Sequence, residues 1–146
     1  MKVLFLDIDG VLNNVNTNFK TDLWPLDRYA AFMVGKIVLD TDCKVVLSSS
    51  WRNHPDAVEL LNKRVTEILD VTPVSWYDKE KDHHSTRGEE IQKWLDAHPE
   101  VTRYAIVDDD ADMLETQLPN FFKTTFASGL TEDIAAAITK HLSESI

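Results

Sequence analysis

The chain has 146 residues, 43% of them apolar and 27% charged, which is an ordinary globular composition at single-domain size. Four glycines and five prolines are too few for a linker or a collagen-like chain, and a single cysteine excludes an intramolecular disulfide. The net charge of −10 argues against a surface built for broad electrostatic capture of nucleic acid.

We expect residues 1–146 to form one soluble domain in the reducing environment of the cytoplasm. The first apolar run is interrupted by Asp7, so it is too short for a secretory signal. No stretch approaches the roughly 18 apolar residues of a membrane span.

The first half of the chain alternates short apolar runs with amphipathic stretches, which predicts strands followed by helices. Pro73 lacks the N–H that a central strand needs, so a strand around it is confined to an edge or a bulge. The expected elements are a strand at residues 3–6, a helix with an apolar face at Leu26, Tyr29, Ala30, Met33 and Ile37, a strand at 45–47, a helix with a face at Val58, Leu61, Val65 and Ile68, and a weak strand at 71–76.

Capping signals mark both helices of the second half. Thr86 and Glu89 have capping-box spacing. Thr131 precedes two acidic residues, which the helix dipole favours in a first turn. The expected elements are a helix after Thr86 with apolar residues Ile91, Trp94 and Leu95, strands at residues 105–107 and 121–126, and a last helix with Ile134, Ile138 and Leu142. This order predicts an α/β fold with a mostly parallel sheet and helices on both faces.

Three of the predicted strands end in residues that handle phosphate or metal: Asp7, Ser48 and Asp108. Ligands of open α/β sheets bind outside the carboxyl ends of the strands, so these residues are expected to converge. Asp9 lies two residues after Asp7, and on an extended segment both carboxylates point the same way. Six of the 25 acidic residues fall in the two segments 7–9 and 108–112.

These residue types suit phosphoryl chemistry. An exposed carboxylate such as Asp7 can attack phosphorus, and a second one such as Asp9 can exchange a proton with the leaving group and with water. The hydroxyl of Ser48 and the guanidinium of Arg52 can bind phosphate oxygens. The acidic run that begins at Asp108 offers the hard oxygen ligands that Mg²⁺ prefers.

With these elements in this order, the chain resembles the haloacid dehalogenase (HAD) superfamily of phosphohydrolases. The likeness runs from Val3 to about Leu142 and is carried by D-x-D-G-V-L after a first strand, an apolar strand ending in Ser, a basic residue opening a helix, and a strand ending in Asp-Asp. The segments LSSSWR, RGEEIQKWL and VDDDADM are similar to a compact branch found in composite "Swiss Army knife" RNA-repair proteins. They are also distantly similar to the 3′-phosphatase domain of phage polynucleotide kinase.

The resemblance implies a three-layer Rossmann-like fold and a Mg²⁺-dependent phosphomonoesterase that works through an aspartyl-phosphate. It also implies a role for each motif residue. Asp7 is the nucleophile and a metal ligand; Asp9 is the general acid/base, with its backbone carbonyl on the metal; Ser48, with Ser49 and Arg52 nearby, holds the phosphoryl group; Arg87 stands where the superfamily has Lys, with Lys79 and Lys81 as alternatives; Asp108 binds the metal, supported by Asp109 or Asp112.

Residues 11–43 and 53–86 are each too few to hold a full cap domain, and this bears on the expected substrate. An uncapped site is open and admits macromolecular ends, so a nucleic-acid 3′-phosphate end is the preferred substrate. A nucleotide or small phosphometabolite is the alternative. No membrane and no obligate protein partner is expected.

Other functions stay open at this point. They are a phospho-accepting receiver module, a metal-dependent nuclease and a silent binding domain. Receiver domains place the acceptor Asp after a middle strand, whereas the strand at 45–47 ends in serines, which argues against the first of these.

Several residues have a plainer structural explanation. Adjacent His83 and His84 do not point together on a strand or helix, which favours a solvated loop over a metal site. Residues 76–84 are expected to be either a substrate loop or a connection. Packing is the preferred explanation for Phe19 and Trp24, although with Trp51 they could stack on a base, and Cys43 is expected to be a small buried hydrophobe.

Overall fold

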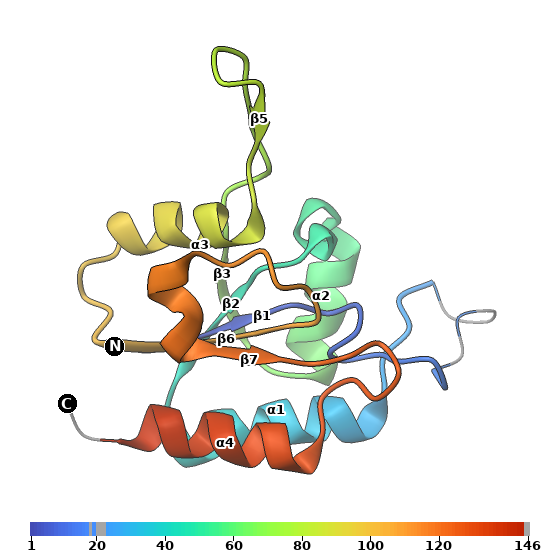
Figure 1. The fold of residues 1–146 in the computed structure, drawn as a ribbon. Helices are drawn as coiled ribbons and strands as arrows, with labels where there is room; N and C mark the ends of the chain where they lie inside the picture. The colour runs from blue at the N-terminus through green and yellow to red at the C-terminus, as the bar shows by residue number, and fades with distance from the viewer. Residues whose placement is uncertain (18, 20–22, 145–146) are drawn as a thin grey trace.

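The computed structural model describes residues 1–17, 19 and 23–144, and its centre is a parallel sheet of five strands in the order β3-β2-β1-β6-β7 (Figure 1). The predicted α/β class is therefore confirmed. In chain order the strands of this sheet are β1 (Lys2–Leu6), β2 (Lys44–Leu47), β3 (Ile68–Val71), β6 (Arg103–Asp108) and β7 (Phe121–Lys123).

Both faces of the sheet are buried, because side chains alternate along each strand. Leu4 and Leu6 of β1 pack on one face with α1 (Arg28–Thr41), α2 (Pro55–Arg64) and α4 (Glu132–Ser143). Val3 and Phe5 pack on the other face with α3 (Arg87–Asp96), where Phe5 meets Trp94 edge to face at a centroid distance of 5.5 Å. Figure 1 shows α1 and α4 side by side on one side of the sheet and α3 on the opposite side.

The helices begin where their capping residues predict. Thr86 and Glu89 form the complete capping box of α3, and the Thr131 side chain accepts a hydrogen bond from the backbone N–H of Ile134 at the start of α4. Asp27 caps α1 in the same way through Ala30. These bonds satisfy backbone donors that have no partner inside a helix.

The region after the second helix was predicted wrongly. Helix α2 ends at Arg64. Ile68 belongs to β3 and not to the helix, and it pairs with Val45 of β2 in the sheet. The expected strand at 71–76 instead ends at Val71, two residues before Pro73, so the proline follows the strand. Val65 and Ile68 still pack on the core. The apolar residues therefore kept a helical spacing across the end of α2 and the start of β3, although the helix itself had ended.

Three smaller predictions were also inaccurate. Leu26 precedes α1, and Tyr29 lies in α1 but is 52% exposed, so neither helps to form a buried helical face. The strand expected at 121–126 ends at Lys123.

Residues 76–84 contain a two-stranded antiparallel hairpin, β4 (Tyr77–Asp78) and β5 (His83–His84), which the sequence did not predict. It projects away from the sheet beyond the start of α3 (Figure 1). Two 3₁₀ helices, Ser50–Asn53 and Glu115–Asn120, were likewise not expected. None of the helices in the described part of the chain is long and apolar enough to cross a membrane.

Candidate active site

The candidate site lies at the carboxyl ends of the central strands. From β1 the chain builds outward to β2 and β3 on one side, then returns to place β6 and β7 on the other, so the strand order reverses at β1. Such a switch point is where open α/β sheets bind ligands. A polar cavity of about 310 Å³ opens there, lined by side chains that include Asp7, Asp9 and Asp108.

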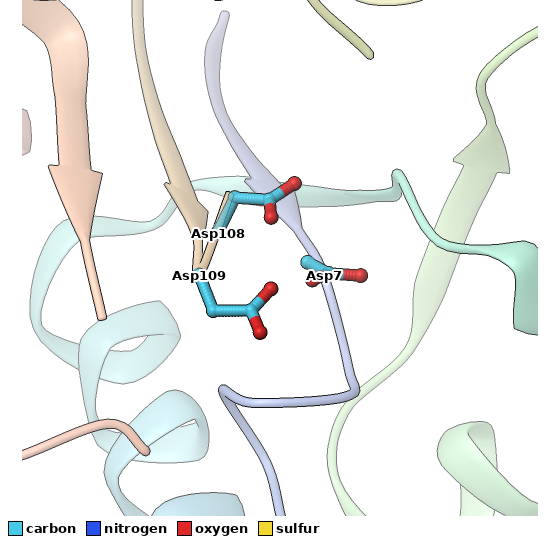
Figure 2. A group of neighbouring side chains, drawn as sticks. All are labelled: Asp7, Asp108 and Asp109. Carbon is cyan, nitrogen blue, oxygen red and sulfur yellow. The ribbon is translucent and has the colours of Figure 1, made fainter. Parts of the chain in front are cut away.

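Three carboxylates form an acidic cluster at this point: Asp7 directly after β1, Asp108 at the end of β6, and Asp109 next to it. One oxygen from each lies within 4.8 Å of the others, and Figure 2 shows the three side chains gathered where the two strands end. Asp7 and Asp108 are buried, whereas Asp109 is partly exposed. The cluster therefore offers three hard oxygen donors to a single cation.

Burial gives the cluster unusual acid–base properties. Desolvation, followed by the charge of Asp108, raises the pKa of Asp7 to about 9. Desolvation also raises the pKa of Asp108 to about 6, although a hydrogen bond from the backbone N–H of Asp110 opposes it. Without a cation, Asp7 therefore holds a proton at neutral pH, because two buried carboxylates cannot both be charged so close together. A bound cation would favour the ionised form of both.

Gly10 permits the close approach of the two acidic loops. Its φ of +82° lies in the left-handed region, and a Cβ there would stand 2.2 Å from Oδ2 of Asp109. The buried hydroxyl of Thr124 donates to the Gly10 carbonyl at 2.6 Å and fixes the loop from the β7 side. Glycine is therefore required both by the backbone conformation and by the space that Asp109 occupies.

Replacing Gly10 with alanine should destabilise the protein by about 1–3 kcal/mol, because the added Cβ is strained and displaces Asp109. Loss of the Asp109 position should also weaken divalent cation binding by roughly tenfold or more. Thermal unfolding with and without added Mg²⁺ measures both effects. Gly35→Ala is the control, since its Cβ meets nothing closer than a backbone oxygen at 3.6 Å. Equal Mg²⁺ responses in the two variants would contradict the prediction.

Asp9 is not a member of the acidic cluster and is held by two hydrogen-bond donors. Its carboxylate accepts from Nδ2 of Asn13 at 2.9 Å and from Nε1 of Trp51 at 3.3 Å. Asn13 also accepts the Gly10 N–H, so the loop after β1 is closed by its own side chains. Asp9 is exposed and lines the same cavity as Asp7, which leaves its carboxylate accessible to a bound ligand.

The serines after β2 have separate roles. Ser48 is 1% exposed, and its hydroxyl has no hydrogen-bond partner among the described residues. Ser49 caps the following 3₁₀ helix by accepting from the Trp51 N–H, and Ser50 lines the cavity. A buried hydroxyl without a partner is costly, and Ser48 is not among the residues that line the cavity.

Arg87 is the first residue of α3 and lies beside the acidic cluster. Its Nε is 3.8 Å from Oδ2 of Asp108, and its backbone N–H donates to the carboxylate of Asp112 at 2.9 Å. Asp112 therefore caps α3, and Asp109 is the second acid that lies within the cluster. Lys79 and Lys81 occupy the exposed turn of the hairpin.

Arg52 is buried and paired rather than free. Its guanidinium donates to the Ser49 carbonyl at 2.9 Å and to Oε1 of Glu90 at 3.0 Å. Its buried Nε has no partner within the described residues, and Arg52 is not among the residues that line the cavity. The sequence singled out Arg52 but not Glu90, because an acidic residue in the first turns of a helix usually reflects capping or the helix dipole.

Packing accounts for Trp24 and Cys43, whereas the solvated loop predicted at His83 and His84 is wrong, because both residues form β5. His83 pairs with Glu89 at 2.6 Å, Trp24 packs against Trp51 at a centroid distance of 5.1 Å, and Cys43 is buried. Phe19 contacts Phe126, although it is 45% exposed. A larger cavity of about 1,020 Å³ lies between α1 and α2, but its lining is mostly apolar and includes none of the strand-end groups.

The sheet, its helices and the acidic cluster where its central strands end define an α/β domain of the haloacid dehalogenase type. The chain belongs to the family described as the HAD domain in Swiss Army Knife RNA repair proteins, whose sequence profile matches residues 3–135. This confirms the resemblance drawn from the motifs, and no inserted cap domain is present in the described residues. No curated protein and no solved structure matches the chain significantly.

Proposed function

We propose that the protein is a Mg²⁺-dependent phosphomonoesterase that acts on nucleic-acid ends carrying a 3′-phosphate. The observation that carries the proposal is the meeting of Asp7, Asp108 and Asp109 with Arg87 at one edge of the sheet. Membership of a family from RNA-repair proteins supports nucleic-acid ends as the substrate. Phosphoryl transfer depends chiefly on positioning and charge stabilisation, which this arrangement can supply.

The donor set fits Mg²⁺. All three side chains of the cluster offer carboxylate oxygens, and the partly exposed Asp109 leaves room for the waters that this ion retains. Asp7, Asp108 and Asp109 would hold the ion. When bound, Mg²⁺ supplies the positive charge that offsets repulsion between a phosphate dianion and the carboxylates.

The remaining steps belong to the residues of the chain. Asp7 attacks the phosphorus and forms an aspartyl-phosphate, while Asp9 gives a proton to the departing hydroxyl oxygen of the sugar. Asp9 then takes a proton from the water that cleaves the acyl-phosphate. Arg87, the buried hydroxyl of Ser48 and the free Nε of Arg52 hold the phosphoryl oxygens in both steps.

The open cavity suits the end of a nucleic-acid strand better than a small molecule that has to be enclosed. The hairpin projects beyond the start of α3 in Figure 1, and the lining of the cavity is mostly polar. Because its net charge is −10, the protein is expected to bind the terminal phosphate and not the phosphates along the nucleic-acid backbone. Binding of a long strand should therefore be weak and salt-sensitive.

The test compares phosphate release from matched oligonucleotides bearing a 3′-phosphate, a 5′-phosphate or no phosphate, with a generic aryl phosphate alongside. We expect Mg²⁺-dependent release from the 3′-phosphate, at least about tenfold faster than from the 5′-phosphate, with loss of activity in excess chelator. Internal cleavage of the unphosphorylated strand would instead favour a nuclease. Hydrolysis of the aryl phosphate alone would retain the phosphatase and move the search to nucleotides and small phosphometabolites.

A further inference from the structure

Glu90 is a buried acid in the cavity to which the proposed reaction gives no role. It is 2% exposed, lies in α3 one turn after Arg87, and lines the same cavity as Asp7. An ionised carboxylate at such a depth is very costly unless it is paired and hydrogen-bonded. Its partners therefore indicate why it is there.

Both oxygens of Glu90 are fully used. Oε1 accepts from Arg52 at 3.0 Å and from Arg87 at 3.2 Å. Oε2 accepts from the hydroxyls of Ser75 and Ser85, at 3.0 and 2.9 Å. Each carboxylate oxygen takes about two hydrogen bonds, so this residue is saturated. A single oxygen thus joins Arg52 to Arg87, which lies beside Asp108 of the acidic cluster.

Glu90 holds both arginines in place without cancelling their combined positive charge. Two guanidinium groups would repel each other, and the proximity of Arg87 lowers the pKa of Arg52, after the larger effect of burial. Glu90 between them offsets this repulsion and leaves a net charge of +1 for the three groups. Nε of Arg52 remains without a partner in the described residues, and Nε of Arg87 faces Asp108.

We propose that Glu90 is a positioning residue that holds Arg52 and Arg87 in the orientation that receives a phosphoryl group. The inference rests on the proposed function, because it assigns to the arginines a phosphate held beside Asp7. The competing explanation is that Glu90 serves only to anchor the hairpin, which Ser75 and Ser85 flank.

Glu90→Gln tests the proposal, since glutamine keeps the length of the side chain and can donate to the serine oxygens but loses the charge that holds the arginines. We expect kcat/KM for phosphate release to fall about 10–100-fold, the usual effect of removing a group that orients direct ligands. Glu89→Gln is the matched control: it removes the same charge from the adjacent residue, and glutamine also serves in a capping box. Its activity should stay within about twofold of the wild type.

A double-mutant cycle separates positioning from anchoring. If Glu90 acts through the arginines, Glu90→Gln should cost less than about threefold in a background that already carries Arg52→Lys and Arg87→Lys. An undiminished loss in that background would overturn the proposal. So would an equal loss in the Ser75→Ala, Ser85→Ala double variant, because hairpin anchorage would then account for the effect.

Calorimetric titration with inorganic phosphate in the presence of Mg²⁺ distinguishes failure of this inference from failure of the proposed function. If the wild type binds phosphate, Glu90→Gln weakens that binding about tenfold or more and no substrate is hydrolysed, the positioning role stands and the phosphatase proposal fails. If Glu90→Gln binds phosphate as tightly as Glu89→Gln does, the positioning role is overturned, whatever the activity. A wild type that neither binds nor releases phosphate overturns both.

Discussion

Replacing Asp7 with asparagine is expected to reduce phosphate release by about 10⁴-fold or more, the scale seen when a covalent nucleophile is removed. Asparagine has nearly the same shape, so the cavity stays intact, but its neutral amide cannot form an aspartyl-phosphate. It also removes one of the three carboxylates of the acidic cluster. The measurement is single-turnover phosphate release in saturating Mg²⁺, which separates loss of chemistry from weaker metal binding.

Asp27→Asn is the control for this variant. Asp27 caps α1 by accepting from the Ala30 N–H at 2.9 Å, and asparagine caps helices about as well. This control should retain activity within about twofold. If Asp7→Asn kept more than a tenth of the wild-type rate, the covalent mechanism would be wrong and a water activated elsewhere in the site would have to replace it.

The meeting of Asp7 and Asp108 could be predicted from the sequence more reliably than the bounds of the elements around them. Asp7, Ser48 and Asp108 follow apolar runs directly, and parallel strands place their carboxyl ends together regardless of where the helices begin. The capping box at Thr86 was equally reliable, because it is a local pattern of two side chains and two backbone groups.

The predicted element boundaries were wrong where one continuous apolar pattern ran through the end of a helix and the start of a strand. Val65 and Ile68 both pack on the same core face, one after the end of α2 and one in β3, so burial alone could not separate them. The chain leaves the helix because the Val65 and Thr66 N–H groups both bond to the Leu61 carbonyl, and Asn62 then accepts from the Ile68 N–H. None of these bonds produces a periodic signal in the sequence.

The interactions of Glu90, Trp51 and Asn13 could not be read from sequence either. Each depends on a partner more than 35 residues away or on the shape of one loop: Glu90 meets Arg52, and Trp51 meets Asp9. A buried acid in a first turn looks like an ordinary dipole-stabilising residue until the fold brings the second arginine to it. In the sequence, Glu90 stood out only as part of the segment RGEEIQKWL, which carried a family resemblance as a whole.

The same Asp7→Asn change is expected to raise the stability of the metal-free protein at pH 8 by about 1–3 kcal/mol, a shift of roughly 3–10 °C in Tm. The pKa of Asp7 is raised from 3.8 to about 9 in the folded state. Between these values the folded chain holds a proton that the unfolded chain has released, so stability falls as the pH rises from about 4 to 9. Asparagine removes this titration, and with it the cost of taking up a proton on folding.

Thermal unfolding in chelator at pH 5, 6.5 and 8 measures the effect, with Asp27→Asn again as the control. The gap between Asp7→Asn and the wild type should widen with pH, because at pH 5 little of the wild-type penalty has yet developed. Added Mg²⁺ should stabilise the wild type more than Asp7→Asn, since ligand binding to the folded state adds stability and the variant has lost a carboxylate. Parallel stability curves across pH would show that Asp7 is not strained by burial. A stability difference between Asp7→Asn and the wild type that widens with pH and that Mg²⁺ closes would mean that the buried Asp7 lowers the stability of the metal-free fold. The carboxylate would then be useful only with a cation and a phosphate bound.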